Sequence, residues 1–190
     1  MPETKIVAEN EYGLAEAAIL SERWLSATTL PDVLARPAVI TAAVEQPSLV
    51  LRRVVIRKQG PALFVEVYAN RPMSQTFLKS VEAVADLLSL PPGWNSYSAK
   101  PIEHQSATQA IRLLAEFLKP STPLPSVVPT VRGGIQLEWH TKGANVEIYI
   151  ESSNEVSFFA EEAGSGKSSD VPLSGHENEL MSWLERLSGK

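Results

Sequence analysis

Apolar and polar residues alternate most regularly between residues 135 and 151. Apolar side chains recur at every second position over 135–139 and 146–150, and period two predicts two β-strands with one apolar face. A turn centred on Lys142-Gly143 joins them into a hairpin. A shift of one residue would bury the charged set, so we expect a firmly held register. The predicted pairs are Ile135 with Ile150, Leu137 with Ile148 and Trp139 with Val146.

The same register predicts a like-charge contact on the polar face. Glu138 lies opposite Glu147, with Gln136 opposite Tyr149 beside them. Like charges directly across two strands are unfavourable. We therefore expect water, a basic side chain such as Arg132, a cation or a partner molecule to offset them.

The hairpin is predicted to extend into an antiparallel meander, with further strands near 127–131 and 155–160. A turn at Ser152–Asn154 sets Ile148 against Phe158 and Ile150 against Val156, and places Phe159 opposite Glu147. A second hairpin is predicted from strands over 49–58 and 63–69. Its first strand carries a basic patch, consisting of Arg52, Arg53, Arg57 and Lys58.

Helical spacing of apolar residues predicts helices over 75–90 and 102–118, a third near 14–27, and a last one after 174. Ser174 and Glu177 form a capping-box pattern, with Ser174 as N-cap. We expect an α+β fold in which an antiparallel β-meander and hairpins pack against two to four helices, leaving the polar strand face partly open. The predicted organisation is an N-terminal helical or irregular segment (1–48), an α+β core (49–160), and a flexible linker with a C-terminal helix (161–190).

Composition narrows the function classes. The net charge is −5 and the pI is about 5.3, which argues against a general nucleic-acid binder. The chain has no cysteine, so disulfides and cysteine-based zinc sites are excluded. We find no membrane span and no signal-peptide layout, and expect a cytoplasmic protein.

Candidate chemistry is sparse. Gly164–Ser168 resembles part of a phosphate-binding loop, but Glu161 stands where the first glycine is needed, so a linker is the better interpretation. The pair Glu138 and Glu147, with His140 diagonal to it, is open to acid/base chemistry, a cation site or an interaction face. We assign no catalytic residue, metal ligand or cofactor.

Two blocks of the sequence resemble a family of small uncharacterised bacterial proteins. The blocks are Gly93-Trp-Asn-Ser-Tyr-Ser-Ala99 and Pro129-Thr-Val-Arg-Gly-Gly-Ile-Gln-Leu-Glu-Trp139, followed by the acidic–apolar strand at 146–150, and the match covers about 85–160. Asn95 replaces the frequent aspartate and Ser98 the usual glycine, which weakens a catalytic interpretation of this loop. The resemblance implies a bacterial cytoplasmic setting and links the loop to the 133–139 segment. We expect the loop, with Trp94 and Tyr97, to pack against the hairpin.

Our leading hypothesis is a non-enzymatic bacterial interaction module with a protein partner, or one that forms a homo-oligomer; a partner or inhibitor of antitoxin or defence-accessory type is one form. The predicted interaction face consists of Gln136, Glu138, His140, Glu147, Tyr149 and Glu151. The alternative is a hydrolase-like enzyme or metal-binding protein that uses Glu138, Glu147, His140 and Tyr149. The basic patch is open to three interpretations: a charge-protected edge strand, a docking site for an acidic partner, or a nucleic-acid contact.

Overall fold

A computed structural model describes residues 4–9, 49–59, 62–70, 73–141, 143–151 and 155–187. The predicted helix at 14–27 and the turn at Ser152–Asn154 lie outside these ranges. Within them the fold is α+β, as expected, with three helices and two sheets. The helices are α1 (Gln75–Leu87), α2 (His104–Phe117) and α3 (Glu177–Leu187).

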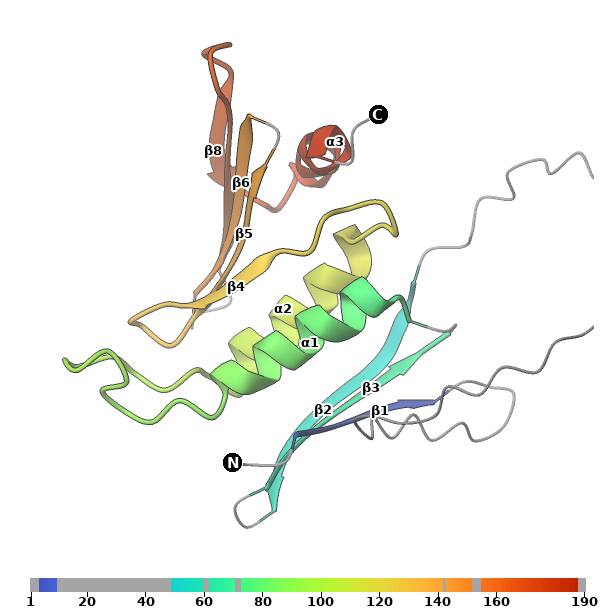
Figure 1. Ribbon diagram of the computed structural model, residues 1–190, viewed down its shortest axis with the longest axis vertical. Helices are drawn as coiled ribbons and strands as arrows, with labels where there is room; N and C mark the ends of the chain where they lie inside the picture. The colour runs from blue at the N-terminus through green and yellow to red at the C-terminus, as the bar shows by residue number, and fades with distance from the viewer. Residues whose placement is uncertain are drawn as a thin grey trace, which may run out of the picture.

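The helices and sheets form layers. Helices α1 and α2 pack side by side between a three-stranded sheet and a five-stranded sheet, and α3 covers the same face of the larger sheet as α2 (Figure 1). Apolar residues from all these layers join one buried core, which includes Val65, Val81, Ile111, Ile148 and Leu180. The periodicity of the helices explains this arrangement, because each turns its apolar stripe toward a sheet.

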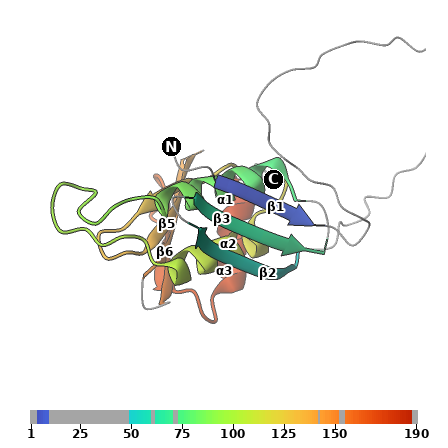
Figure 2. The ribbon, with the colours of Figure 1, turned by 90° about the horizontal axis from the view of Figure 1, so that it is seen from below.

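The smaller sheet has the order β1-β3-β2, seen side by side in Figure 2. Its strands are β1 (Thr4–Glu9), β2 (Leu51–Gln59) and β3 (Ala62–Ala69). Strands β2 and β3 form the predicted antiparallel hairpin, whereas β1 pairs in parallel with β3 and was not predicted. Strand β2 is therefore an edge strand within the described part of the sheet.

The larger sheet is an antiparallel meander with the order β4-β5-β6-β7-β8. All the predicted pairs of the central hairpin are confirmed, including Leu137 with Ile148 and Glu138 with Glu147. The predicted pairing of Ile148 with Phe158, and of Glu147 with Phe159, is confirmed as well. The strands are β4 (Ser126–Pro129), β5 (Ile135–Thr141), β6 (Ala144–Ile150), β7 (Val156–Glu162) and β8 (Ser168–Pro172).

Two expectations for the C-terminal part need correction. The part of 161–190 that precedes the C-terminal helix was expected to be a flexible linker, but strand β8 lies within it and pairs with β7. Strand pairing outweighs the glycine- and serine-rich composition here, because β7 offers a free edge and Val171 packs against the core. Helix α3 begins at Glu177, so Ser174 is not its N-cap; the Glu177 carboxylate instead accepts a hydrogen bond from the Gly175 amide at 3.2 Å.

The ends of α1 follow from local chemistry. Ser74 is the N-cap, and its hydroxyl accepts a hydrogen bond from the Phe77 amide at 3.1 Å. None of the described helices has the length and hydrophobicity needed to cross a bilayer.

Candidate functional site

The larger sheet has one face covered by helices and one open face. Side chains alternate between these faces along each strand, so paired residues mark rows that run across the open one. One row joins Glu138, Glu147, Phe159 and Asp170, and a neighbouring row joins His140, Asn145 and Glu161. We call this surface the acidic face; it consists of Gln136, Glu138, His140, Asn145, Glu147, Tyr149, Phe159, Glu161 and Asp170.

A chain of hydrogen bonds links the first part of the acidic face. His140 Nε2 lies 3.3 Å from Glu138 Oε2, and its Nδ1 lies 3.0 Å from Asn145 Oδ1. Asn145 in turn donates to Glu161 Oε1 at 2.6 Å. Both ring nitrogens therefore face acceptors, an arrangement that favours the protonated ring. The hydrogen bond with Asn145, followed by that with Glu138 and the charges of Glu138 and Glu147, raises the pKa of His140 above its usual value, although desolvation opposes them.

A second set of hydrogen bonds converges on Glu147. Gln136 Nε2 donates to its Oε2 at 2.8 Å, and the Tyr149 hydroxyl donates to the same oxygen. The hydrogen bond to Glu147, with burial and the nearby negative charges, raises the pKa of Tyr149 to about 12. These contacts offset the repulsion between the two carboxylates. Glu138 is hydrogen-bonded to His140, and Glu147 accepts hydrogen bonds from two neutral donors.

The acidic face keeps a strong negative charge. Four carboxylates, those of Glu138, Glu147, Glu161 and Asp170, share it with His140, which is the one basic side chain among the described residues of its rows. Within the described residues no lysine or arginine occupies a position on its rows. The predicted neutraliser, Arg132, lies exposed on the turn between β4 and β5 and forms no ion pair with these carboxylates in the described part of the chain.

Glu151 differs from the other residues of the predicted interaction face. It lies one position beyond the end of β6, and its Oε2 atom is buried without a hydrogen-bond partner. Close packing surrounds this point, because a Cβ atom on Gly134 would lie 2.3 Å from the Ile150 carbonyl oxygen and 3.0 Å from the Glu151 Cα. Glu151 therefore packs at the end of the sheet. The other five residues of the predicted interaction face all belong to the acidic face.

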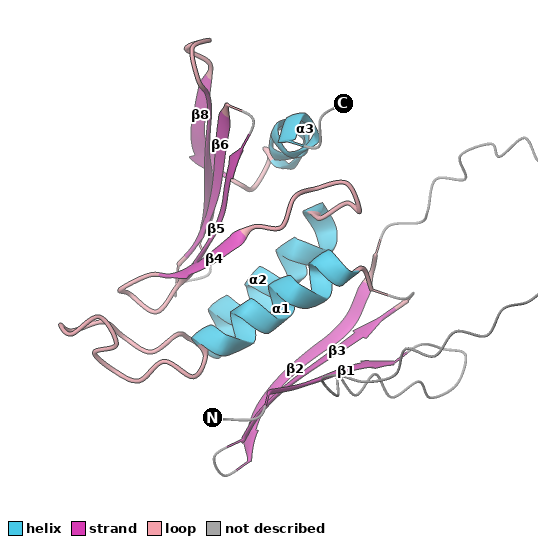
Figure 3. Cartoon of the chain, in the orientation of Figure 1, coloured by secondary structure: helices cyan, strands magenta, loops and turns pink. Residues whose placement is uncertain are grey.

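The loop between α1 and α2 lies against the β4–β5 turn, whereas we expected Trp94 and Tyr97 to pack against the β5–β6 hairpin. The Lys100 amide donates to the Val131 carbonyl and the Glu103 amide to that of Gly133, each at 3.0 Å, which ties the loop to the β4–β5 turn (Figure 3). The Asn95 side chain accepts hydrogen bonds from the amides of Tyr97 and Ala99, and Trp94 Nε1 donates to Lys100 O at 3.2 Å.

This packing bears on the enzyme hypothesis, because a hydrolase that uses Glu138, Glu147, His140 and Tyr149 needs an element that closes a pocket over them. Trp94 instead folds back onto its own loop through the hydrogen bond to Lys100, while the Tyr97 side chain is 85% exposed. The loop is held against the β4–β5 turn at the end of the sheet (Figure 3).

The described residues contain no cluster of three or more metal-ligating side chains. Three clefts that are lined by described residues all include residues of α2, and none of these includes Glu138 or Glu147. The carboxylates, His140 and Tyr149 are thus joined on an open strand surface, where they hydrogen bond mainly to one another. Such an arrangement suits contact with a partner surface better than the enclosure of a small substrate.

The basic patch divides into separate parts. Arg57 forms an ion pair with Glu66, and its Cζ atom lies 5.7 Å from the centroid of the Phe64 ring. Its positive charge is therefore already paired within the protein. Arg53 is exposed, and Arg52 lies at an irregularity of the strand register between Leu51 and Arg53. Lys58 lies on β2, but its side chain is outside the described part of the structure.

Sequence reasoning missed three members of the acidic face: Asn145, Glu161 and Asp170. Period two alone could have found the first two, because Asn145 precedes Glu147 by two positions and Glu161 follows Phe159 by two. Asp170 had no such signal, since its strand carries one strongly apolar residue, Val171.

Comparisons with protein-family models, with curated proteins and with solved structures found no match to this chain.

Proposed function

We propose that this protein is a non-enzymatic interaction module that binds a basic partner protein through the acidic face. One observation carries the proposal: four carboxylates lie on one open sheet face that has no lysine or arginine among its described residues. Charged surfaces of one sign attract partners of the opposite sign and guide their approach. The bacterial and cytoplasmic setting stays a prediction.

The hydrogen bonds within the acidic face support this function. Glu138, Glu147 and Glu161 are held by His140, Gln136, Tyr149 and Asn145, so their positions are fixed before a partner arrives. Fixed side chains lose less conformational entropy on binding. Phe159 and Tyr149 are half-buried between the carboxylates, and aromatic residues often anchor protein interfaces.

A capture experiment with three baits tests the proposal. Wild type, Glu138→Arg/Glu147→Arg, and Glu82→Arg/Asp86→Arg are immobilised and exposed to a lysate of the source organism; Glu82 and Asp86 are exposed carboxylates on α1. We expect a basic protein to be retained by wild type and by the α1 variant but not by the acidic-face variant. Purified partner should then bind with the same ranking.

Light scattering coupled to size exclusion separates self-association from binding of another protein. If wild type is an oligomer and Glu138→Arg/Glu147→Arg is a folded monomer, the acidic face binds a second copy instead. If every retained protein binds all three baits equally, the proposal is wrong.

A further inference from the structure

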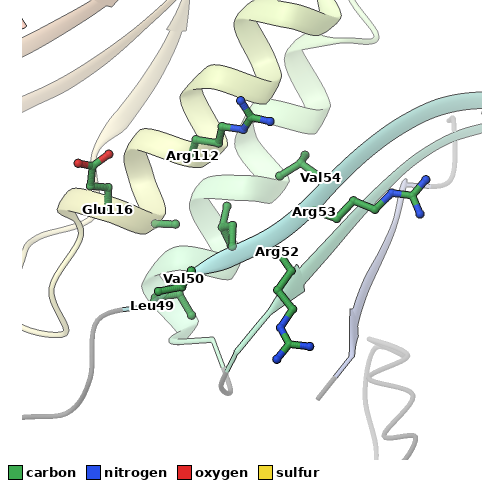
Figure 4. A pocket seen from close by; sticks show the side chains of 9 residues that line it. Leu49, Val50, Arg52, Arg53, Val54, Arg112 and Glu116 are labelled. Atoms are coloured by element: carbon green, nitrogen blue, oxygen red, sulfur yellow. The ribbon is translucent and has the colours of Figure 1, made fainter. Parts of the chain in front are cut away.

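A groove runs along the free edge of β2, beside α2. One cleft of about 400 Å³ is lined by residues 49–54 together with Arg112, Ala115 and Glu116 (Figure 4). A second cleft of about 330 Å³ is lined by Ile56 and by residues of the first half of α2, and it shares Arg112 with the first. Their lining residues follow one another along β2, so we refer to the two clefts together as the β2–α2 groove; they span about eight residues, or roughly 25 Å of extended chain.

The edge of β2 is suited to accept another strand. Within the described residues β3 is its only strand neighbour, so its other edge has no strand partner there. An edge strand with unpaired amide and carbonyl groups is a template for an added strand. Several peptide-binding proteins use such a strand beside a helix.

The groove is basic. Arg53 projects from β2 and Arg112 projects from α2, while Glu116 is the one acidic residue among the residues that line the two clefts (Figure 4). Arg52 also lines the first cleft, but its side chain points away from α2 and has a partner of its own, so we do not count it as a ligand contact. The guanidinium groups of Arg53 and Arg112 do not converge on one point. This spacing suits a ligand with several separated negative charges better than a single small anion.

We propose that the β2–α2 groove binds an extended acidic segment of a partner protein, which adds to the smaller sheet as a strand beside β2. On one side of the added strand, carboxylates would meet Arg53. On the other side, apolar residues would meet Val54 and Ile56, which pack against the core. This site is separate from the acidic face and has the opposite charge.

A second copy is a poorer occupant than an acidic segment. Pairing of β2 with β2 of another copy would gather Arg53 and Arg57 of both chains on one sheet face, because the two residues point the same way. A nucleic acid could meet the arginines but has no peptide backbone to pair with the strand edge. These alternatives give different results in the test below.

Fluorescence polarisation with a labelled peptide of alternating glutamate and valine tests the proposal. We expect saturable binding that weakens with salt, and no binding of the matched lysine–valine peptide. Two further glutamate–valine peptides are methylated on the backbone nitrogen. One carries the methyl groups on all odd-numbered residues, and the other carries them on all even-numbered residues. Only one edge of an added strand faces β2, so one methylated peptide should lose more than about tenfold in affinity and the other should bind like the parent.

Variants locate the site. Arg53→Glu/Arg112→Glu should weaken binding by about tenfold or more, whereas Arg132→Glu, a charge reversal on the exposed β4–β5 turn, should change it little. Arg53→Gln/Arg112→Gln should give a smaller loss of peptide affinity. It replaces the charge-reversed variant in the test if circular dichroism shows that the reversed variant is unfolded.

The proposal is overturned by absent binding, by equal binding of both methylated peptides, or by unchanged affinity in the folded arginine variants. A single-stranded oligonucleotide that displaces the peptide at equal concentration would also overturn it, in favour of a nucleic-acid site. Concentration-dependent dimers that the peptide dissociates would show that a second copy occupies the groove. None of these outcomes depends on whether the acidic face binds a basic protein.

Discussion

His140 is the residue whose charge can adjust the acidic face. It lies between Glu138 and Asn145, with a side chain that is 48% exposed. Protonation places one positive charge beside Glu138, and deprotonation leaves the carboxylates without a cation on their rows in the described residues. The acidic face therefore becomes more negative as pH rises through the pKa of His140.

We predict that NMR titration of the His140 ring in the folded protein gives a pKa above 6.5, its ordinary value. Since the folded pKa is raised, protonation of His140 stabilises the fold in full below about pH 6.5, and this contribution is lost as pH rises through the folded pKa. The effect on the free energy of unfolding should be small, because the side chain is well exposed.

Variants test the cause of this shift. Asn145→Ala should move the pKa of His140 back toward 6.5, because the hydrogen bond with Asn145 contributes most to the shift. Glu82→Gln, which changes a carboxylate on the exposed side of α1, should leave it unchanged. A wild-type pKa at or below 6.5 would contradict this account of the acidic face.

Gly134 shows how closely the backbone packs at the end of the larger sheet. A Cβ atom there would lie 2.3 Å from the Ile150 carbonyl oxygen, so we predict that Gly134→Ala lowers the free energy of unfolding by more than about 2 kcal/mol. Gly143→Ala is the matched control: Gly143 has φ +74° but open space around its Cβ position, so the cost should be about 1–2 kcal/mol. Denaturant unfolding measures both, and equal losses would contradict the close approach.

Contacts between individual residues could be predicted where the period-two alternation of a strand determined the register. The pairing of Glu138 with Glu147 followed from alternation, because any other register would bury charge. The hydrogen bonds that relieve this pair were not predictable. They depend on side-chain conformations, such as that of Tyr149, and on the Asn145–Glu161 contact between two strands.

At the scale of elements, strong periodicity located α1, α2, α3 and the central strands, and errors fell on weakly patterned segments. Strand β1 has six residues and gains its stability from a parallel partner more than 50 positions away. Strand β8 has five residues and depends on the edge of β7. Tertiary pairing decides the structure of such short segments, and local sequence does not reveal it.

The start of α1 illustrates an element that local chemistry fixes. We predict that Ser74→Ala lowers the free energy of unfolding by about 1 kcal/mol, because the Phe77 amide loses its acceptor. Ser89→Ala, just after the same helix, removes an exposed hydroxyl that donates to the Asp86 carbonyl, and should cost less than about 0.5 kcal/mol. Thermal or denaturant unfolding compares the two, and an equal loss would argue against the cap.

At the scale of the whole molecule, the two sheets lie on opposite sides of the α1–α2 pair (Figure 1). The sequence predicted both hairpins but not this arrangement, because strand order and layer order depend on contacts between distant segments. The layering leaves two features of opposite charge: the acidic face of the larger sheet and the β2–α2 groove beside the smaller one. If both proposals hold, one molecule binds a basic and an acidic partner at separate sites.

The central claim is that the acidic face binds a cationic partner surface. The most direct test is an amide NMR titration of the folded protein with a peptide of alternating lysine and threonine. We predict saturable shifts that cluster on β5, β6 and β7 around Glu138, Glu147 and Glu161, and that disappear in Glu138→Arg/Glu147→Arg but persist in Glu82→Arg/Asp86→Arg. Shifts that do not saturate, or that cluster on α1 or the smaller sheet, would contradict the claim.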